Sequence, residues 1–144
     1  MPRVGQIMNK SPKSIGPKTS VVSAAKTMRS ERVGSLLVKQ GRQFVGIVTD
    51  TDIARRAVAS GKNLGKLTVE KIMTSPVCTI ERSQSVDDAQ DMMGDLGIRH
   101  LGVTSGGEIV GVVSVRDLLL HYKRYAQSKI TPEAMYPEPK IAQD

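Results

Sequence analysis

The chain repeats itself at an offset of 65 residues, and this repeat limits the fold more than any other feature. The string GIVTDTDIARR at residues 46–56 returns as GVVSVRDLLLH at residues 111–121. The alignment extends to both sides without a gap and begins where Val4 meets Val69. A chain of 144 residues is long enough for two small units that share a core. We therefore expect two copies of one structural unit.

Each copy has the residue pattern of a βαββα unit. A short strand is predicted near residues 14–16 and again near 78–80, and Ser20 and Ser85 are placed to cap the helices that follow. Two strands joined by a glycine-containing turn come next, and a last helix ends each copy. These patterns predict three segments: repeat 1 at 1–62, repeat 2 at 63–126 and an irregular tail at 127–144.

Composition excludes several classes of protein. Cys78 is the single cysteine, so an intramolecular disulfide is impossible and a disulfide-rich secreted protein is excluded. No window approaches the roughly 20 apolar residues of a membrane span, and the N-terminal residues lack the apolar core of a signal peptide. We therefore expect a cytoplasmic protein without a membrane partner.

The positive charge is concentrated in the first half of the chain. Residues 1–66 carry 13 Lys and Arg against 3 Asp and Glu, whereas residues 67–144 carry 8 against 11. A basic half is typical of proteins that bind nucleic acid, and Lys26, Arg29 and Arg32 near the end of one predicted helix are candidate contacts. Few aromatic residues are present for base stacking. Nucleic-acid binding without sequence preference is the alternative function.

The sequences Thr49-x-x-Asp52 and Ser114-x-x-Asp117 have the pattern of helix capping boxes. In such a box the hydroxyl accepts from a backbone N–H of the first turn, and the carboxylate reaches back to the cap residue. The same atoms suit a nucleotide, because a carboxylate can accept hydrogen bonds from both vicinal ribose hydroxyls and a helix N-terminus can hold a phosphate. The residues alone leave both interpretations open.

Other chemical motifs fail on spacing. GKNLGKL, which starts at Gly61, is one residue short of a phosphate-binding loop and has Leu67 where a hydroxyl is needed. His100 and His121 have no further ligand at a metal-binding spacing, so we expect no metal. Cys78 lacks a local catalytic signature, and no activated nucleophile or acid–base pair stands out. We therefore expect no enzymatic activity.

The chain resembles the tandem cystathionine β-synthase (CBS) domains over about residues 4–125. The resemblance rests on VGQIM and VEKIM at the start of the copies, RVGSLLV and GIRHLGV at their middle strands, and the two G-h-h-[ST]-x-x-D ends. It implies an α/β fold of the α+β kind, in which two pseudo-symmetric CBS units, each βαββα, pack sheet to sheet. It also implies clefts between the units that bind AMP, ADP, ATP or S-adenosylmethionine as ligands, with no cofactor.

The resemblance further implies a regulatory role. CBS pairs commonly form homodimers through their helices and regulate other proteins. Because the two repeats occupy nearly the whole chain, we expect a stand-alone module that signals energy or metabolite state to an unknown partner protein.

The resemblance also assigns the site residues. It implies that the carboxylates of Asp52 and Asp117 contact the ribose. It implies that the hydroxyls of Thr49 and Ser114 contact ribose or phosphate, and that Thr51 and Arg116, which precede the two aspartates, contact phosphate. The Asp52 site would add backbone near Cys78 for the adenine edge, and Arg99 and His100 for phosphate.

The Asp117 site would add backbone near Lys13, with Gly34 and Ser35 at the places of Arg99 and His100. This departure from symmetry predicts two unequal clefts. With an ordinary histidine pKa of about 6.5, His100 would make phosphate binding in the Asp52 cleft depend on pH. In the Asp117 cleft, Arg116 would supply the phosphate contact instead.

Overall fold

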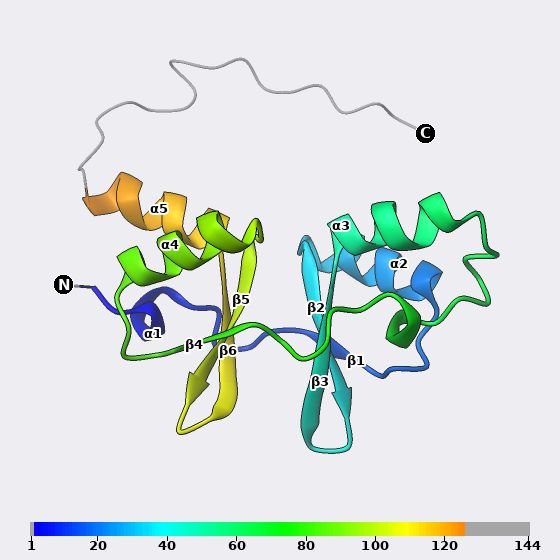
Figure 1. Ribbon diagram of the computed structural model, residues 1–144, viewed down its shortest axis with the longest axis horizontal. Coiled ribbons are helices and arrows are strands. Elements are labelled where there is room, and N and C mark those ends of the chain that lie inside the picture. The colour runs from blue at the N-terminus through cyan, green and yellow to red at the C-terminus, as the bar shows by residue number, and fades with distance from the viewer. Residues whose placement is uncertain (1, 126–144) are drawn as a thin grey trace, which may run out of the picture.

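The computed structural model describes residues 2–125 and contains two three-stranded sheets with helices packed beside them (Figure 1). In chain order the elements are α1 (Val4–Ile7), β1 (Ser14–Ile15), α2 (Val21–Glu31), β2 (Ser35–Gln40), β3 (Gln43–Thr49), α3 (Asp50–Asp52), η1 (Ile53–Ala57), η2 (Val58–Ser60), η3 (Val69–Lys71), β4 (Thr79–Glu81), α4 (Val86–Leu96), β5 (His100–Ser105), β6 (Glu108–Ser114) and α5 (Val115–Tyr125). The predicted irregular tail at 127–144 lies outside the described residues.

The two sheets have the same topology, and the predicted βαββα order is confirmed. In the first sheet β1 pairs parallel to β2, and β2 pairs antiparallel to β3. In the second sheet β4, β5 and β6 pair in the same two ways. The hairpin turns need a left-handed backbone, which glycine adopts without strain, and Gly41 (φ +64°) and Gly106 (φ +60°) supply it.

The first helix of each unit begins and buries residues as its sequence predicts. Ser20 accepts a hydrogen bond from the Ser23 amide, and Ser85 with Asp88 forms a full capping box. Gly97 ends α4 in the left-handed conformation. The apolar face of each helix is buried: Val21, Ala24 and Met28 in α2, and Val86, Ala89 and Met93 in α4. Within residues 2–125, no helix combines the length and apolar composition that a bilayer crossing needs.

The last helix differs between the units. In the second unit α5 is a regular α-helix, whereas residues 50–60 change from one α-turn (α3) through a π-helix (η1) to a 3₁₀ turn (η2). Within this segment Ala57 is fully buried, while Arg56 donates to the carbonyls of Ile72 and Met73. A π-turn contains about one residue more than an α-helical turn. In this segment the π-turn coincides with the burial of Ala57 and with the hydrogen bonds that Arg56 makes to two carbonyls.

The short helices that open the two repeats are exchanged between the units. Val4 of α1 is fully buried in the core beneath α4 and α5, which belong to the second half of the chain. Val69 and Ile72, from the start of the second repeat, are buried in the core of the first half. Figure 1 shows the dark blue α1 beside the helices of the second half. The repeat in sequence and the packed unit in space therefore contain different residues.

Each exchanged segment then crosses a strand of the unit that it enters. The backbones of Asn9 and Val112 exchange hydrogen bonds of 2.8 and 3.1 Å, and those of Thr74 and Ile47 exchange bonds of 2.9 and 3.0 Å. The close approach requires glycine on the crossed strand. A Cβ at Gly111 would lie 2.6 Å from the carbonyl oxygen of Asn9.

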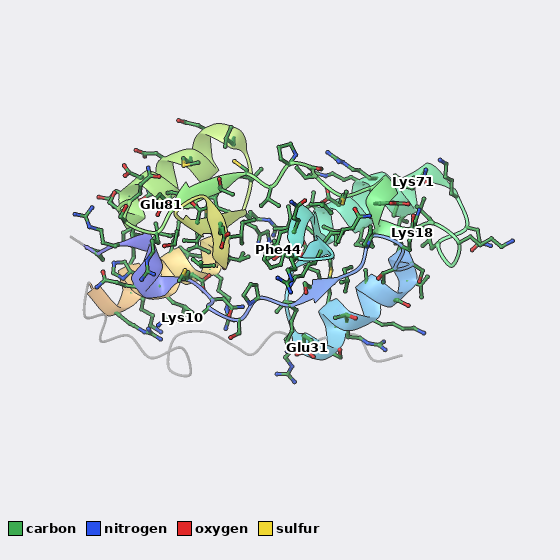
Figure 2. All side chains as sticks on the ribbon, turned by 90° about the horizontal axis from the view of Figure 1, so that it is seen from below. Lys10, Lys18, Glu31, Phe44, Lys71 and Glu81 are labelled. Carbon is green, nitrogen blue, oxygen red and sulfur yellow. The ribbon has the colours of Figure 1, made fainter. Side chains whose placement is uncertain are left out.

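The two sheets pack against each other at the centre of the molecule, as expected. Leu37 and Ile47 of the first sheet and Val112 of the second form a buried cluster, and Phe44 packs against it. Figure 2 shows Phe44 where the two halves meet. Burial of apolar area of this kind stabilises the folded state by roughly 25 cal/mol per Å². The contact between the sheets therefore holds the two units together.

Replacing Gly111 by Ala tests the crossing. The added methyl group would meet the Asn9 carbonyl and the Met8 sulfur, at 2.6 and 2.7 Å. We expect the free energy of unfolding to fall by about 1–3 kcal/mol, as for overpacking, in urea denaturation.

Gly94→Ala is the matched control, because Gly94 lies within α4 and a Cβ there meets nothing within 4 Å. This change should raise the free energy of unfolding by about 0.5–1 kcal/mol. Equal effects of the two substitutions would contradict the packing account.

Candidate functional site

Two clefts lie at the junction of the halves, and together they contain every residue predicted for the site. The first, the Asp52 cleft, has a volume of about 200 Å³ and includes Thr49, Thr51, Asp52, Cys78, Arg99 and His100. The second, the Asp117 cleft, has a volume of about 530 Å³ and includes Lys13, Gly34, Ser35, Ser114, Arg116 and Asp117. Each cleft therefore combines an [ST]-x-x-D helix start from one repeat with groups from the other.

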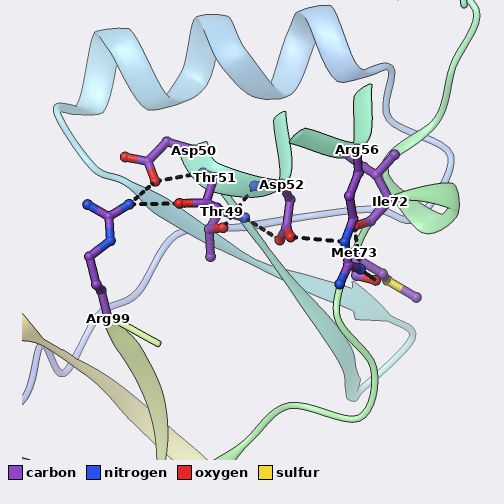
Figure 3. A network of polar contacts seen from close by, with 8 residues as sticks. All are labelled: Thr49, Asp50, Thr51, Asp52, Arg56, Ile72, Met73 and Arg99. Carbon is purple, nitrogen blue, oxygen red and sulfur yellow. Dashed lines mark hydrogen bonds and ion pairs between the residues drawn. The ribbon is translucent and has the colours of Figure 1, made fainter. Parts of the chain in front are cut away.

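The Asp52 carboxylate is buried, with one oxygen in a hydrogen bond and the other in a long ion pair. Its Oδ2 accepts from the Thr49 amide at 3.0 Å, and the Thr49 hydroxyl accepts from the Asp52 amide at 3.2 Å, which completes the predicted capping box. Its Oδ1 lies 3.6 Å from Nε of Arg56. Arg56 in turn donates to the carbonyls of Ile72 and Met73, so the arginine connects the cap to the exchanged segment (Figure 3).

The Asp117 carboxylate keeps one oxygen free. Its Oδ2 accepts from the Ser114 amide at 2.8 Å and from the Ser114 hydroxyl at 3.0 Å. The Ser114 hydroxyl accepts from the Asp117 amide at 3.2 Å. Among the described residues Oδ1 of Asp117 has no hydrogen-bond partner. This oxygen of Asp117 is therefore available to accept from a ligand.

Arg99 forms the wall between the two clefts. Its Nη2 donates to Oδ1 of Asp50 at 2.7 Å and to the hydroxyl of Thr51 at 2.9 Å (Figure 3). Arg99 and His100 line both clefts, and Asp50 lines the Asp117 cleft as well. The sequence assigned Arg99 to the Asp52 cleft alone and did not identify Asp50 as its partner.

His100 departs from the expectation of an ordinary pKa. Burial lowers the pKa of its ring below 6.5; the charge of Arg99 also lowers it, while Asp50, Asp117 and Asp52 oppose the shift. Its buried Nδ1 has no hydrogen-bond partner within residues 2–125. The ring therefore gains its proton at a lower pH than the sequence predicted, and it does so beside both clefts.

The Asp117 cleft holds more positive charge than the sequence predicted. Gly34 and Ser35 are neutral, but Arg32 and Arg99 line the same cleft. Arg32 ends α2 in a left-handed conformation with φ of +55°. The available signal was its place two residues before Gly34, within the RVGSLLV motif.

The cationic side chains of the two clefts differ in the hydrogen bonds and ion pairs that they already make to protein oxygens. In the Asp52 cleft Arg56 and Arg99 are both bonded to protein oxygens. In the Asp117 cleft neither Arg32 nor Arg116 makes a side-chain hydrogen bond or ion pair with the described residues, and Lys13 has a long ion pair of 3.8 Å to Glu31. The Asp117 cleft therefore offers free cationic donors, which are suited to an anionic ligand.

The described residues contain no group of three His, Cys, Asp or Glu side chains that could hold a metal ion.

Known proteins share this sequence pattern. The CBS domain family matches residues 4–59 and 69–124. An uncharacterised protein of Methanopyrus kandleri is 31% identical over 118 residues, which make up 81% of this chain and 60% of that protein. The chain thus spans less than two thirds of the length of that relative.

Solved structures share the fold. A CBS-domain protein of Burkholderia ambifaria has a TM-score of 0.82 at 32% identity and covers 90% of this chain and 98% of its own. The hexameric CBS-CP12 protein of bloom-forming cyanobacteria has a TM-score of 0.78 at 25% identity and covers 92% of this chain and 78% of its own. The tandem family matches, the internal repeat and the shared fold show that this chain belongs to the CBS domain family, as a CBS pair.

Proposed function

We propose that this protein binds adenosine nucleotides in the two clefts and signals energy or metabolite state to a partner protein. The observation that carries the proposal is Oδ1 of Asp117, which has no hydrogen-bond partner among the described residues and lies at a helix start, in a cleft of about 530 Å³ that Arg32 and Arg116 also line. A carboxylate oxygen of this kind can accept from the vicinal hydroxyls of a ribose. The positive end of the helix dipole and the Arg116 guanidinium favour the phosphate.

The adenine ring would lie against the backbone that precedes the first strand of each sheet. The carbonyl of Lys13 already accepts from the Leu37 amide at 3.0 Å, and that of Cys78 accepts from the Gly102 amide at 2.9 Å. Each carbonyl retains a second lone pair that can accept from the adenine amino group. The Cys78 thiol and the apolar wall of the Asp52 cleft would then contact the ring.

The position of the clefts between the two halves supports the proposed regulatory role. A ligand that binds between the two halves contacts both, so it favours the relative arrangement of the halves to which it binds best. The described residues bring together helix caps, hydrogen-bond acceptors and cations in the clefts, and such a set suits the binding of an anionic ligand. We infer that a partner protein responds to whether the ligand is bound.

Nucleic-acid binding by the basic half stays a sequence-based prediction. Lys26, Arg29 and Arg32 are exposed at the end of α2. The single aromatic ring of residues 1–66 is Phe44, which packs between the sheets and carries the Lys39 ammonium 5.2 Å from its centre. Because this ring packs between the sheets, residues 1–66 offer no aromatic ring on which a base could stack. We therefore favour adenosine-nucleotide binding over nucleic-acid binding.

Replacing Asp117 by Ala tests ribose recognition. Loss of the acceptor leaves the ligand hydroxyls unpaired, so binding of adenosine and AMP at that cleft should weaken by about 1–3 kcal/mol in calorimetric titrations. Asp52→Ala should act in the same direction at its own cleft.

Asp88→Ala is the matched control for these substitutions. Asp88 closes the same kind of capping box on α4 and lines neither cleft. All three variants should lose stability through the lost cap, by about 0.5–2 kcal/mol, but the Asp88 variant should keep wild-type affinity. Wild-type affinity in the Asp117 and Asp52 variants would leave capping as the sole role of these carboxylates.

Phosphate recognition is tested by Arg116→Ala in the Asp52→Ala background, which leaves the Asp117 cleft intact. AMP should lose roughly tenfold in affinity while adenosine keeps its own, because the guanidinium bonds only the phosphate. Arg124→Ala, in the last turn of the same helix, is the charge-matched control.

His100 should make nucleotide binding depend on pH. Its pKa lies below 6.5 in the free protein, and a bound phosphate beside the ring favours the protonated form. The advantage of wild type over His100→Gln in AMP affinity should therefore grow as pH falls from about 7.5 to 5.5. The comparison with His100→Gln cancels the titration of the phosphate itself. For adenosine the ratio should stay constant, and a constant ratio for AMP would remove His100 from phosphate binding.

We also propose a homodimer formed through the helices. Large apolar side chains are exposed in the helical layer: Val58, Leu96, Leu119 and Leu120. A two-fold dimer is the usual closed assembly of such a surface. Light scattering at micromolar concentration should give about twice the chain mass of 15.6 kDa. A mass of one chain throughout the concentration range would reject the dimer.

A further inference from the structure

Arg99 is bonded to one residue from each cleft. It immediately precedes β5 in the second half, and its Nη2 donates to Oδ1 of Asp50 at 2.7 Å and to the Thr51 hydroxyl at 2.9 Å, both in α3 of the first half (Figure 3). Asp50 lines the Asp117 cleft, Thr51 lines the Asp52 cleft, and Arg99 lines both. One guanidinium is therefore shared by the two clefts.

This ion pair has no counterpart elsewhere in the repeat. At the offset of 65 residues Gly34 stands at the place of Arg99. Val115 stands at the place of Asp50, so the equivalent pair carries no charge. Gly34 also leaves room for the carboxylate, because a Cβ there would lie 3.1 Å from Oδ2 of Asp50. The pair thus joins the two clefts at one place only and puts an anion into the Asp117 cleft.

We propose that Asp50 makes the two clefts compete for Arg99, so that a phosphate bound in one cleft weakens the binding of a phosphate in the other. This inference rests on the nucleotide binding proposed above and adds its regulation. In the structure the Asp50 carboxylate bonds the guanidinium that a phosphate would need. A phosphate in either cleft must therefore take Arg99 from Asp50 or share it.

A phosphate in the Asp52 cleft depends on Arg99. The other arginine of this cleft, Arg56, already donates to two backbone carbonyls and lies 3.6 Å from the Asp52 carboxylate. His100 carries little charge near neutral pH, because burial lowers its pKa below 6.5. Transfer of Arg99 to the phosphate leaves Asp50 uncompensated in the Asp117 cleft. A carboxylate there repels a second phosphate.

The other charged residues of the Asp117 cleft do not cancel this effect. Arg32 and Arg116 line the cleft and make no ion pair with the described residues. Either could turn to Asp50, but a guanidinium that pairs with Asp50 is one donor fewer for a phosphate in the same cleft. Lys13 faces Glu31 at 3.8 Å, and Asp117 adds a second carboxylate. The loss of Arg99 therefore weakens phosphate binding here in each case.

The competition acts in both directions. A phosphate in the Asp117 cleft that binds Arg99 draws the guanidinium away from Thr51 and from the Asp52 cleft. Linkage requires the two effects on affinity to be equal. The second nucleotide then binds only at a higher concentration than the first, so the module responds over a wider range of concentration than one site covers. Adenosine has no phosphate and should show no coupling.

Calorimetric titrations of three proteins measure the coupling. Wild type has both clefts, whereas Asp52→Ala and Asp117→Ala each leave one cleft intact. For independent clefts, the product of the two wild-type dissociation constants for AMP equals the product of the two single-cleft constants. Competition should make the wild-type product larger by at least about threefold, a factor that a half-exposed ion pair can supply. For adenosine the two products should agree.

Asp50→Asn tests whether this carboxylate is the cause. The change removes the charge and keeps the size of the side chain. AMP should bind each cleft more tightly by about threefold, adenosine should bind as before, and the excess in the AMP product should disappear when all three proteins carry the change. Asp87→Asn is the control, because Asp87 also lies in the first turn of a helix and lines neither cleft. It should leave the AMP constants at their wild-type values.

The outcomes separate this inference from the proposed function. Absence of AMP and adenosine binding to wild type would reject the proposed function and the coupling with it. Binding of AMP with equal products would overturn the coupling alone. An excess that persists in the Asp50→Asn proteins would assign the coupling to direct repulsion between the two phosphates, and it would overturn the role of Asp50.

Discussion

The arrangement of this protein depends on two backbone crossings at which each repeat enters the other. The segment after α1 crosses β6 through the Asn9–Val112 hydrogen bonds, and the segment after η3 crosses β3 through the Thr74–Ile47 bonds. Both crossings need a glycine on the strand, because the passing backbone and a methionine side chain occupy the space of a Cβ. Since Val4 and Val69 complete the core of the opposite half, neither half has a whole core alone.

The crossings also place the clefts. They bring the segments that end near Lys13 and Cys78 across to the [ST]-x-x-D helix start of the opposite repeat, so each cleft has a wall from either half. The carboxylates that cap the helices thus become the acceptors of the clefts. In the proposed function the same carboxylate caps a helix and accepts from the ligand, because a cap needs only one of its oxygens and the second oxygen of Asp117 has no hydrogen-bond partner among the described residues.

Departures from the repeat make the clefts unequal. Arg56, which forms a long ion pair with Asp52, has no arginine counterpart in the second copy, where His121 stands. Arg99 is held by Asp50 and stands between the clefts, where a phosphate on either side would compete with Asp50 for it. The two halves share their sheet topology and differ in the charged residues at their clefts.

The sequence by itself determined the local structure: the repeat, the caps at Ser20 and Ser85, the glycine turns, and the two [ST]-x-x-D starts, whereas the other cleft members came from the resemblance to the CBS family. These depend on residues close together in the chain or on the offset. The exchange of Val4 and Val69, the place of Arg32 in the Asp117 cleft, and the lowered pKa of His100 were decided only by the tertiary structure. Each arises from contacts between residues far apart in sequence, where burial and neighbouring charge appear only once the two halves have packed together.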